Sequence, residues 1–582
     1  MHRTRTWEMV PPELRVRNRI LPVSGGDGST LSLDFTSGVL DPRFTFSRSS
    51  TATLINSQGY LQFANANLMT YSNPRQTGTA WLASGTVTWG SSTLTDPTGG
   101  SAAQSITFGT TGSAIFNTSG TTVVSGITHT FSVWMRSATG TTNVRIGDAN
   151  VGVVATVTLT TTWQRFSCQY TTSGTNDGGA IYSQTGTPSA EFYVWGAQVQ
   201  PGSIVGELIQ TSGTINTNAP RFDYDPTTLA PRGLLLEGSA TNLTTRSDDF
   251  NTTVNDGTQW STSGYTSGTL STTLPDGTTG NARRISIASG SGSFRSQTIT
   301  VTANTAYTWS FWARNNGGSQ ARYRVWNVTA GSSIVDYTLS GNNYVSSIGG
   351  ANNTSSTWVR VSVPFTTPAG CTGVYVYPCS SDSGTVDLLV WGAQLEAGSG
   401  GASSYIPTGT SQVQRATDTM TMADISALNF NQSGGTVLMQ VEGNPRDQGV
   451  FPHFAGFEQS PSGRGWNFLR LNNTSAGVLR MLGTAWNSAG GTLINSANHT
   501  RPAGRFKFAA TLEPSVSRMT YVISGGSALV DTSTAGTLAT IGSLRFNNTT
   551  DTAATDFGSV WVSQFKYWPT VLPNATLQSL TA

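Results

Sequence analysis

One eleven-residue stretch occurs twice in this chain, and it constrains the fold more than any other feature. Residues 193–203 are YVWGAQVQPGS and residues 389–399 are LVWGAQLEAGS, so that Trp195 returns as Trp391, 196 positions later. This interval far exceeds the period of a solenoid or a propeller blade. The repeated object is therefore expected to be a whole domain.

Three further landmarks recur upstream of each copy in the same order. They are NLMT at 67–70 and NLTT at 242–245, FSVWMR at 131–136 and WSFWAR at 309–314, and TWQRF at 162–166 and TWVRV at 357–361. Most of them alternate apolar and polar residues, which is the period of a half-buried strand. Two related β-sandwiches are predicted, with Trp134 and Trp312 facing the core rather than a ligand.

The composition agrees with an all-β chain of three or four domains. Among 582 residues, charged residues make up only 11%, while Gly numbers 65, Trp 16, Tyr 16 and Phe 24. Aromatics spread throughout argue against disorder, and Thr-rich strands with Gly or Asn turns are typical of extracellular-style β structure. A net charge of +2 argues against nucleic-acid binding, which needs a basic stripe. No apolar run is long enough to span a bilayer, and no signal-peptide core follows Met1.

Residues 1–28 form an extended N-terminal arm with five arginines and three prolines, which ends in a Gly- and Ser-rich stop. This composition favours an anchor that docks on a partner protein. Short strands are expected in 29–66, and the connector 213–241 also has strand character. Since neither piece can bury a core alone, we expect them to pair in a small collar, with the first repeat inserted between them.

The remaining domain boundaries follow from the repeat. The first unit spans 67–212 and the second 242–410, and a second kind of sandwich is expected over 411–582 because apolar alternation continues there. The only predicted helix lies at 572–580, with Asn574 as its N-cap.

Metal and disulfide chemistry have little support in the sequence. Cys168, Cys371 and Cys379 are an odd number without metal spacing, so free and mostly buried thiols are expected. Calcium stays open, because carboxylates near expected strand junctions could supply oxygen ligands but show no diagnostic spacing. They are Asp248, Asp249, Asp256 and Asp276. No cofactor is predicted.

Several of these motifs together resemble structural proteins of tailed bacteriophages. They are FSRSSTAT at 46–53, PRFDYD at 220–225, RGLLLE at 232–237 with TNL at 241–243, and WGAQLE at 391–396. The chain is similar to tail-fibre or capsid-fibre appendages that carry carbohydrate-binding-module-like jelly rolls. Residues 411–582 resemble laminin-G or concanavalin-like lectin domains. The resemblance implies a virion component, a homotrimer, and release by host lysis.

Catalysis has no clear candidate. No nucleophile elbow and no zinc-binding helix motif is present. Asp223 and Asp225 would face the same way on a strand, but Pro226 beside them favours a structural turn over a glycosidase pair. The sequence therefore predicts a protein that is not an enzyme.

Sugar binding is the sharper hypothesis, because a sugar ring stacks on an exposed aromatic while amides or arginines meet its hydroxyls. The carbohydrate-binding candidates are His453, Phe454, Arg464, Trp466 and Trp486. In the repeats, Tyr71, Trp81, Trp89, Trp260 and Tyr265 are further expected loop aromatics. A single shallow site would be weak, and three chains would add avidity.

Together these observations predict an all-β virion attachment protein with two tandem jelly rolls and a lectin-like C-terminal sandwich. It is expected to bind host-surface glycans through its modules and other virion proteins through residues 1–28. Three alternatives stay open: a purely structural capsid or tail decoration, a glycan depolymerase, and a secreted adhesin.

Overall fold

The structure is a computed structural model of the 582-residue chain. It describes residues 26–75, 81–109, 112–117, 126–172, 178–185, 187–253, 257–288, 290–317, 320–340, 357–381, 385–398, 401–444, 453–459, 464–473, 479–487, 492–495, 499–500, 502, 504–533, 536–546 and 559–582.

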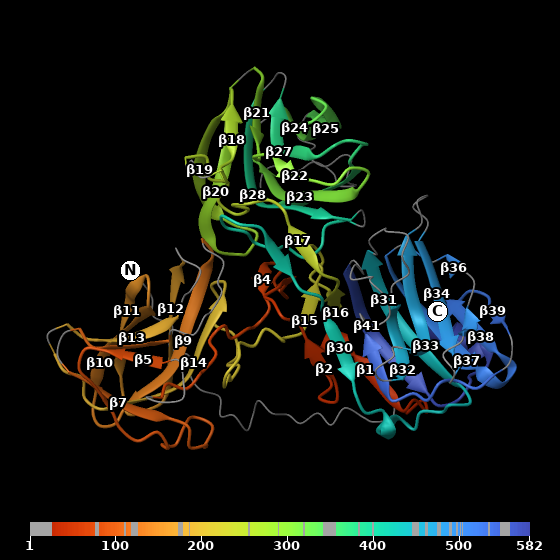
Figure 1. Cartoon of the computed structure of the whole chain (residues 1–582), viewed down its shortest axis with the longest axis horizontal. Helices are drawn as coiled ribbons and strands as arrows, with labels where there is room; N and C mark the ends of the chain where they lie inside the picture. Colours follow the sequence, from red (N-terminus) through yellow and green to blue (C-terminus); the bar gives the residue numbers. More distant parts are fainter. Residues whose placement is uncertain are drawn as a thin grey trace.

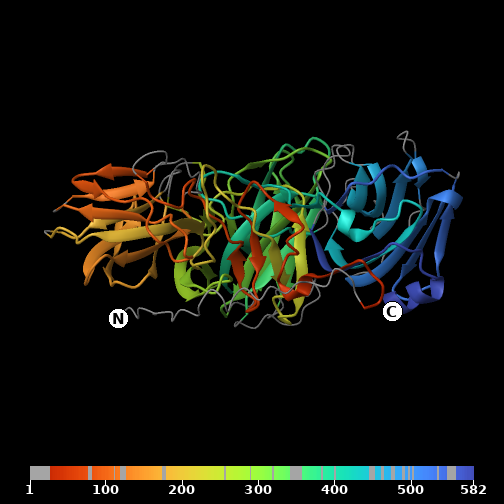
Figure 2. The same ribbon diagram turned by 90° about the horizontal axis from the view of Figure 1, so that it is seen from below.

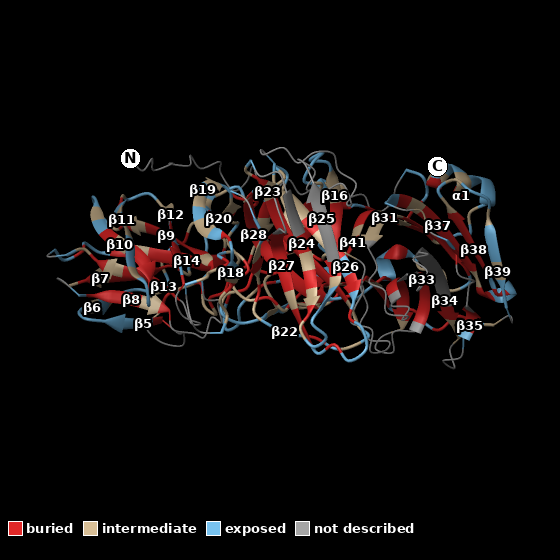
Figure 3. Cartoon of the chain, turned by 90° about the horizontal axis from the view of Figure 1, so that it is seen from above, coloured by how far each residue is buried: buried red, intermediate tan, exposed pale blue. Residues whose placement is uncertain are grey.

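The all-β prediction is confirmed. Figure 1 shows three lobes, one from each repeat and one from the C-terminal third, joined through a central region that holds β15–β17. Seen from below, the lobes follow one another along the long axis of the molecule (Figure 2). Burial is concentrated inside each lobe, where the strands face one another (Figure 3). Each lobe therefore has its own core. None of the helices in the described part of the chain is long and apolar enough to cross a membrane.

The first module consists of two five-stranded antiparallel sheets, ordered β11-β10-β13-β8-β5 and β12-β9-β14-β7-β6. Its strands are β5 (Trp81–Ser84), β6 (Val87–Trp89), β7 (Gln104–Phe108), β8 (Ala114–Asn117), β9 (Thr128–Ser137), β10 (Thr142–Asp148), β11 (Gly152–Leu159), β12 (Gln164–Thr171), β13 (Gly179–Ser183) and β14 (Phe192–Pro201). Phe131, Val133 and Met135 of β9 lie fully inside the sandwich.

The second module repeats this plan, with sheets β18-β21-β27-β24-β25 and β19-β20-β28-β23-β26; β22 also pairs with β27. Its strands are β18 (Ser261–Ser263), β19 (Thr266–Thr273), β20 (Thr279–Ile287), β21 (Gly292–Arg295), β22 (Ile299–Thr300), β23 (Ala306–Asn315), β24 (Gln320–Asn327), β25 (Ser332–Ser340), β26 (Val359–Thr366), β27 (Gly373–Ser381) and β28 (Val386–Ala397).

The repeated tryptophans lie on the opposite face from the one predicted. Trp309, Phe311 and Ala313 fill the sandwich core, so Trp312 points outward, where it packs edge-on against Trp391 and Tyr405 with ring centroids 5.4 and 5.2 Å away. Trp134 is likewise half-buried on the outer face of β9. Alternation alone could not assign the faces, because chain segments cover the outside of this sheet as well.

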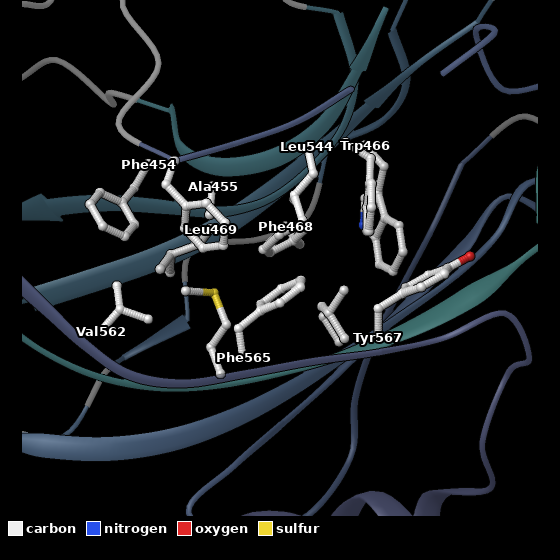
Figure 4. Close-up of a cluster of buried hydrophobic side chains, with 14 of the residues drawn as sticks. Phe454, Ala455, Trp466, Phe468, Leu469, Leu544, Val562, Phe565 and Tyr567 are labelled. Carbon is white, nitrogen blue, oxygen red and sulfur yellow. The ribbon is translucent and has the colours of Figure 1, made fainter. Parts of the chain in front are cut away.

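The C-terminal sandwich has two large sheets, ordered β15-β16-β41-β31-β37-β38-β39, with β1 also on β41, and β2-β30-β40-β32-β33-β34-β35, with β36 on β34. Its strands from the last third are β30 (Thr419–Met422), β31 (Gly435–Asn444), β32 (His453–Gln459), β33 (Arg464–Asn473), β34 (Leu479–Trp486), β35 (Thr492–Asn495), β36 (His499–Thr500), β37 (Arg505–Glu513), β38 (Arg518–Ile523), β39 (Leu529–Thr532), β40 (Ser543–Phe546) and β41 (Ser559–Trp568). Figure 4 shows aromatic side chains of both sheets meeting in its core.

The predicted collar is not a separate unit. Strands β1 (Leu31–Asp34), β2 (Thr45–Ser47), β15 (Arg221–Tyr224) and β16 (Pro231–Glu237) belong to the C-terminal sandwich. Along one edge of β41, β16 occupies residues 559–562 and β1 occupies residues 564–567. Among the described residues, β1 of the segment 29–66 and β16 of the segment 213–241 therefore both pair with β41. This long strand offers more backbone hydrogen bonds than the two short segments offer each other. Strands β3 (Thr53–Ile55) and β4 (Leu61–Phe63) pair only with each other, and β17 (Ala240–Asn242) pairs with β29 (Val413–Arg415).

The N-terminal arm ends earlier than predicted, because Asp27, within the predicted arm, already contacts the C-terminal sandwich. Asp27 accepts a 2.7 Å bond from Lys566, and its carbonyl accepts a bond from Trp568. Residues 1–25 lie outside the described residues.

A charged hub joins the C-terminal sandwich to the segment that follows β28 of the second module. Its members are Arg48, Arg221, Glu237, Arg415 and Asp418. Arg221 donates to Glu237 (2.7 Å) and to Asp418, while Arg48 donates to the other oxygen of Asp418 (3.0 Å). All five side chains are at most 2% exposed. Arg48, Arg221 and Glu237 belong to the motifs at 46–53, 220–225 and 232–237, which lie outside the two repeats. These motifs therefore form the joint between domains.

Hydrogen bonds extend the hub into neighbouring segments. Arg221 also donates to the carbonyl of Thr53 and to Ser404, and Ser559 donates to Glu237. Burial opposes ionisation of Glu237, but Arg415 and Arg221 outweigh it and hold the pKa of that carboxyl well below its usual range. The joint therefore stays charged and locks distant parts of the chain together.

Two smaller predictions concern the tail and the cysteines. The helix is confirmed as α1 (Asn574–Thr581), but Pro573 is its N-cap and Asn574 is its first helical residue. The three cysteines are free and buried, as predicted.

Candidate functional site

The two modules can be superposed strand by strand, which separates shared architecture from features of one module. In the first, Arg145 of β10 lies opposite Tyr182 of β13. In the second, Arg324 of β24 lies opposite Tyr377 of β27. The turns support this equivalence, because the side chain of the last residue of each strand, Asp148 or Asn327, accepts bonds from backbone N–H groups two and three residues later. The arginine–tyrosine pair is common to both modules.

The neighbouring pair on the same sheet face differs sharply. In the first module Gly147 lies opposite Ala180, whereas at the same place in the second module Trp326 lies opposite Tyr375. Two small residues are thus replaced by two large aromatics on the outer face of the second sheet. A feature present in only one of two otherwise similar modules is a better candidate for function than one present in both.

These side chains form the aromatic tile, which consists of Arg295, Arg324, Trp326, Tyr375 and Tyr377. The Arg295 guanidinium lies 3.8 Å from the ring centroid of Tyr375, and the Tyr375 and Tyr377 rings meet edge to face at 6.4 Å and 83°. Arg324 lies 5.6 Å from Trp326 and 5.8 Å from Tyr377. Cations over ring faces of this kind fix the rings in place.

The tile is a partly solvent-facing surface. Arg295, Arg324, Trp326 and Tyr375 are half-buried, and Tyr377 is 8% exposed. Burial raises the pKa of Tyr377, although Arg295 and Arg324 act in the opposite direction, so its hydroxyl keeps its proton at neutral pH. A rigid aromatic surface with phenol and guanidinium donors can stack a sugar ring and meet its hydroxyls.

Sequence reasoning missed this tile, although a signal existed. RYRVW at 322–326 and YVY at 375–377 alternate large aromatics or arginines with other residues, and such alternation predicts a strand with one decorated face. A position-by-position comparison of the two repeats across these strands shows that Trp326 and Tyr375 stand where the first repeat has Gly147 and Ala180.

Two of the predicted carbohydrate-binding residues are core residues instead. Phe454 and Trp466 are each 1% exposed, and Figure 4 shows both among the packed side chains of the C-terminal sandwich. The Trp466 ring lies 6.0 Å from Phe457 and 5.7 Å from Phe468. The glycines and amides near them lie within β32 and β33 and not in loops, and the aromatic side chains there turn inward.

Of the other three predicted residues, Trp486 alone has a side chain within the described part of the chain. His453 opens β32 and lies opposite Arg470, and Arg464 opens β33 and lies opposite Gln459; both side chains fall outside the described residues. Trp486 is half-buried at the end of β34.

Most loop aromatics expected in the repeats are also structural. Trp81 and Trp260 are core residues that donate to backbone carbonyls of Tyr71 and Thr245 at 3.0 and 3.1 Å. Tyr265 is buried, and Tyr71 and Trp89 are half-buried. These prediction errors share a cause, since Trp81 and Tyr265 adjoin short edge strands that still pack on the core.

The acidic residues considered for calcium are engaged in other contacts. Asp276 accepts bonds from the backbone and hydroxyl of Thr278, and Asp249 accepts one from the Asn251 N–H. Within the described ranges, no group of three His, Cys, Asp or Glu side chains gathers as a metal-ligand set, and Asp256 lies outside those ranges. Asp223, weighed above as a catalytic acid, is buried and accepts bonds from Ile55 and Trp561.

No family model and no curated protein matches this chain. Among solved structures, it is similar to the tandem CBM22-1–CBM22-2 carbohydrate-binding modules of Paenibacillus barcinonensis Xyn10C, at 11% identity and a TM-score of 0.20 over 57% of this chain and 97% of that one. It is similar to a CBM4 structure at 18% identity and a TM-score of 0.17, over 25% of this chain and 99% of that one.

It is also similar to the enzymatically active domain of tailspike protein 4 of bacteriophage CBA120, at 16% identity and a TM-score of 0.19, over 26% of this chain and 22% of that one. TM-scores this low say nothing about what this chain binds or does.

Proposed function

We propose that this chain is a non-enzymatic attachment protein of a tailed-phage virion, and that it binds host-surface glycans through the aromatic tile. The observation that carries the glycan-binding part is the replacement of Gly147 and Ala180 by Trp326 and Tyr375 at equivalent positions of two similar modules. Packing of the fold does not demand these aromatics, because the first module forms the same sheet without them.

The virion part of the proposal rests on the motifs of the sequence and on their place in the fold. Arg48, Arg221 and Glu237 come from the phage-type motifs, and their ion pairs, with the bonds of Arg221 and Glu237 to Ser404, join the C-terminal sandwich to the end of the second repeat. A protein that must present binding modules at a fixed spacing benefits from such a joint. A homotrimer would place three tiles on one surface and raise a weak affinity through avidity.

Replacing Trp326 and Tyr375 together by alanine is expected to weaken glycan binding by about tenfold or more, because the stacking surface is lost. Binding of the full-length chain to polysaccharide extracted from the host, measured by calorimetry, checks this prediction. Little unfolding is expected, since alanine and glycine occupy these positions in the first module.

The matched control is the double change of Trp163 and Tyr193 to alanine in the first module. These half-buried rings lie 5.6 and 4.3 Å from the Arg136 guanidinium, so the control also removes two aromatics beside an arginine. Loss of binding in this control with full binding in the tile variant would place the site in the first module and refute the proposal. Normal host adsorption by particles carrying the tile variant would favour a purely structural decoration, and shortening of the polysaccharide would favour a depolymerase.

Deleting residues 1–25 is expected to abolish incorporation into particles while leaving a folded chain. The deletion stops before Asp27, because Asp27 is bonded to Lys566 and Trp568 of the C-terminal sandwich. Particle composition by gel and the melting temperature of the purified chain measure the two effects. Incorporation at the normal level would show that the arm is not the anchor.

A further inference from the structure

The charges on the tile face of the second module point to a narrower class of ligand. Three adjacent strands, β21, β24 and β27, place Arg295 and Arg324 on this sheet and contribute no acidic residue. The one acidic residue of the neighbouring strand β25 is Asp336, which lies opposite Arg324. The register places Asp336 opposite Arg324, whereas Arg295 lies opposite Ser261 and its strand β21 pairs with no acidic residue.

Arg295 is held in position without being neutralised. Its guanidinium is stacked on Tyr375 at 3.8 Å, and one of its nitrogens donates to the carbonyl of Ser296 at 3.1 Å. Among the described residues no carboxylate pairs with it. The nearest neighbours on its own strand are Ser293 and Phe294, which carry no charge. A guanidinium presents five N–H donors, so most of them remain available to a ligand.

The geometry suits an anion that arrives with a sugar ring. Arg295 covers one side of Tyr375, while Trp326 lies directly opposite Tyr375 on the next strand. A sugar ring stacked on Trp326 would therefore lie on the same sheet face as Tyr375 and the guanidinium that covers it. Planar guanidinium groups bind carboxylates through two parallel hydrogen bonds, which neutral hydroxyls do not match in strength.

We propose that the aromatic tile takes an acidic glycan, with the carboxylate of a uronic-acid residue bound by Arg295 and the sugar ring stacked on Trp326. This inference rests on the proposed function, because it names the ligand class of the same site. It distinguishes the roles of two residues: Trp326 supplies affinity for any sugar of suitable shape, whereas Arg295 selects those that carry a negative charge.

The test uses the full-length chain and two matched probes, polygalacturonate and the same polymer after chemical reduction of its carboxyl groups. A second pair, hyaluronate and carboxyl-reduced hyaluronate, varies the backbone. The acidic polymer of at least one pair is expected to bind about tenfold or more tightly than its reduced form. Arg295→Gln should abolish this preference and leave the binding of the reduced polymer unchanged, and Arg295→Lys should restore part of it.

Two controls separate specific recognition from general attraction of polyanions. Arg145→Gln changes an arginine of the first module that donates to the Ser183 carbonyl, and it should leave the preference intact. Dextran sulfate is a polyanion without uronate carboxyl groups, so it tests general attraction to negative charge. If it binds, its affinity should be the same for wild type and the tile variants.

The outcomes are distinguishable. Equal affinity for acidic and reduced polymers, with both lost in the Trp326 and Tyr375 double variant, would overturn the acidic ligand class and leave the proposed function standing. Binding that survives the double variant, or absent binding to every polymer and to host polysaccharide, would overturn the proposed function together with this inference. An unchanged preference in Arg295→Gln, with a melting temperature equal to wild type, would reject the role of Arg295.

Discussion

Arg221→Met is expected to destabilise the chain by about 3–5 kcal/mol, because it removes the central cation of a buried ionic group and leaves carboxylates behind. In the native hub Arg221 is paired with both Glu237 and Asp418, and none of the three is more than 1% exposed in its side chain. Methionine fills much of the same volume but cannot donate. The loss of stability would therefore come from the unpaired carboxylates of Glu237 and Asp418 and not from a cavity.

The location of the hub adds a second expected result. Thr53, Ser404 and Ser559, which contact Arg221 or Glu237, come from three distant parts of the sequence. Loosening this joint should uncouple the lobes, so that one thermal transition separates into two or more. Differential scanning calorimetry and chemical denaturation measure both effects.

Arg284→Met is the matched control. Arg284 donates two 2.8 Å hydrogen bonds to the carboxylate of Asp387, but its side chain is 42% exposed. Exposed pairs contribute about 0–1 kcal/mol, so this variant should remain close to wild type. If Arg221→Met cost no more than Arg284→Met, the hub would not be what holds the lobes together.

Architecture could be predicted from the sequence further than the site could. The repeat of Trp195 at Trp391 gave two related sandwiches, since a period of two within the landmarks specifies strands. Face assignment failed at Trp134 and Trp312, because other chain segments cover the outer face of each of their sheets. Alternation of apolar and polar residues then no longer shows which face points into the core. The collar failed for a related reason: strand character in 29–66 and 213–241 does not reveal that β41 is the partner of both.

The aromatic tile could not be predicted from residue types alone. Phe454 and Trp466 have aromatic rings near amides and glycines, as a sugar-binding residue should, yet they point into the core. Whether a strand residue faces inward is decided by its register with neighbouring strands. The pair Trp326 and Tyr375 became visible as a site only when pairing placed them opposite each other and showed Gly147 and Ala180 in the same place.

Raising the pH from about 4 to above 7 is expected to destabilise the second module through Asp248. Burial raises the pKa of this carboxyl from 3.8 to about 7, and the charges of Asp276 and Asp249 act in the same direction, while the hydrogen bond from Tyr405 opposes them. Ser247 also donates to the carboxylate. Between these two pKa values the folded chain binds more protons than the unfolded chain, so the free energy of unfolding falls as pH rises.

Asp248→Asn should therefore raise the melting temperature at pH 8 and change it little at pH 4. The substitution is compatible with the fold, because the first module has Asn73 at the equivalent position, where its side-chain oxygen accepts a bond from the Gly196 N–H. Each unit of pKa shift corresponds to about 1.4 kcal/mol, so the difference between the two pH values should be large. Melting temperatures of wild type and variant across pH 4–8 measure it.

Asp225→Asn is the control with the opposite sign. Backbone bonds from Thr228 and Thr227 lower the pKa of Asp225, so its contribution to stability is present above pH 4 and is lost as the carboxyl is protonated in acid. This variant should lower the melting temperature at pH 8. If the melting temperatures of wild type and Asp248→Asn changed with pH in parallel, burial would not oppose ionisation of Asp248 in the folded chain, and this prediction would be wrong.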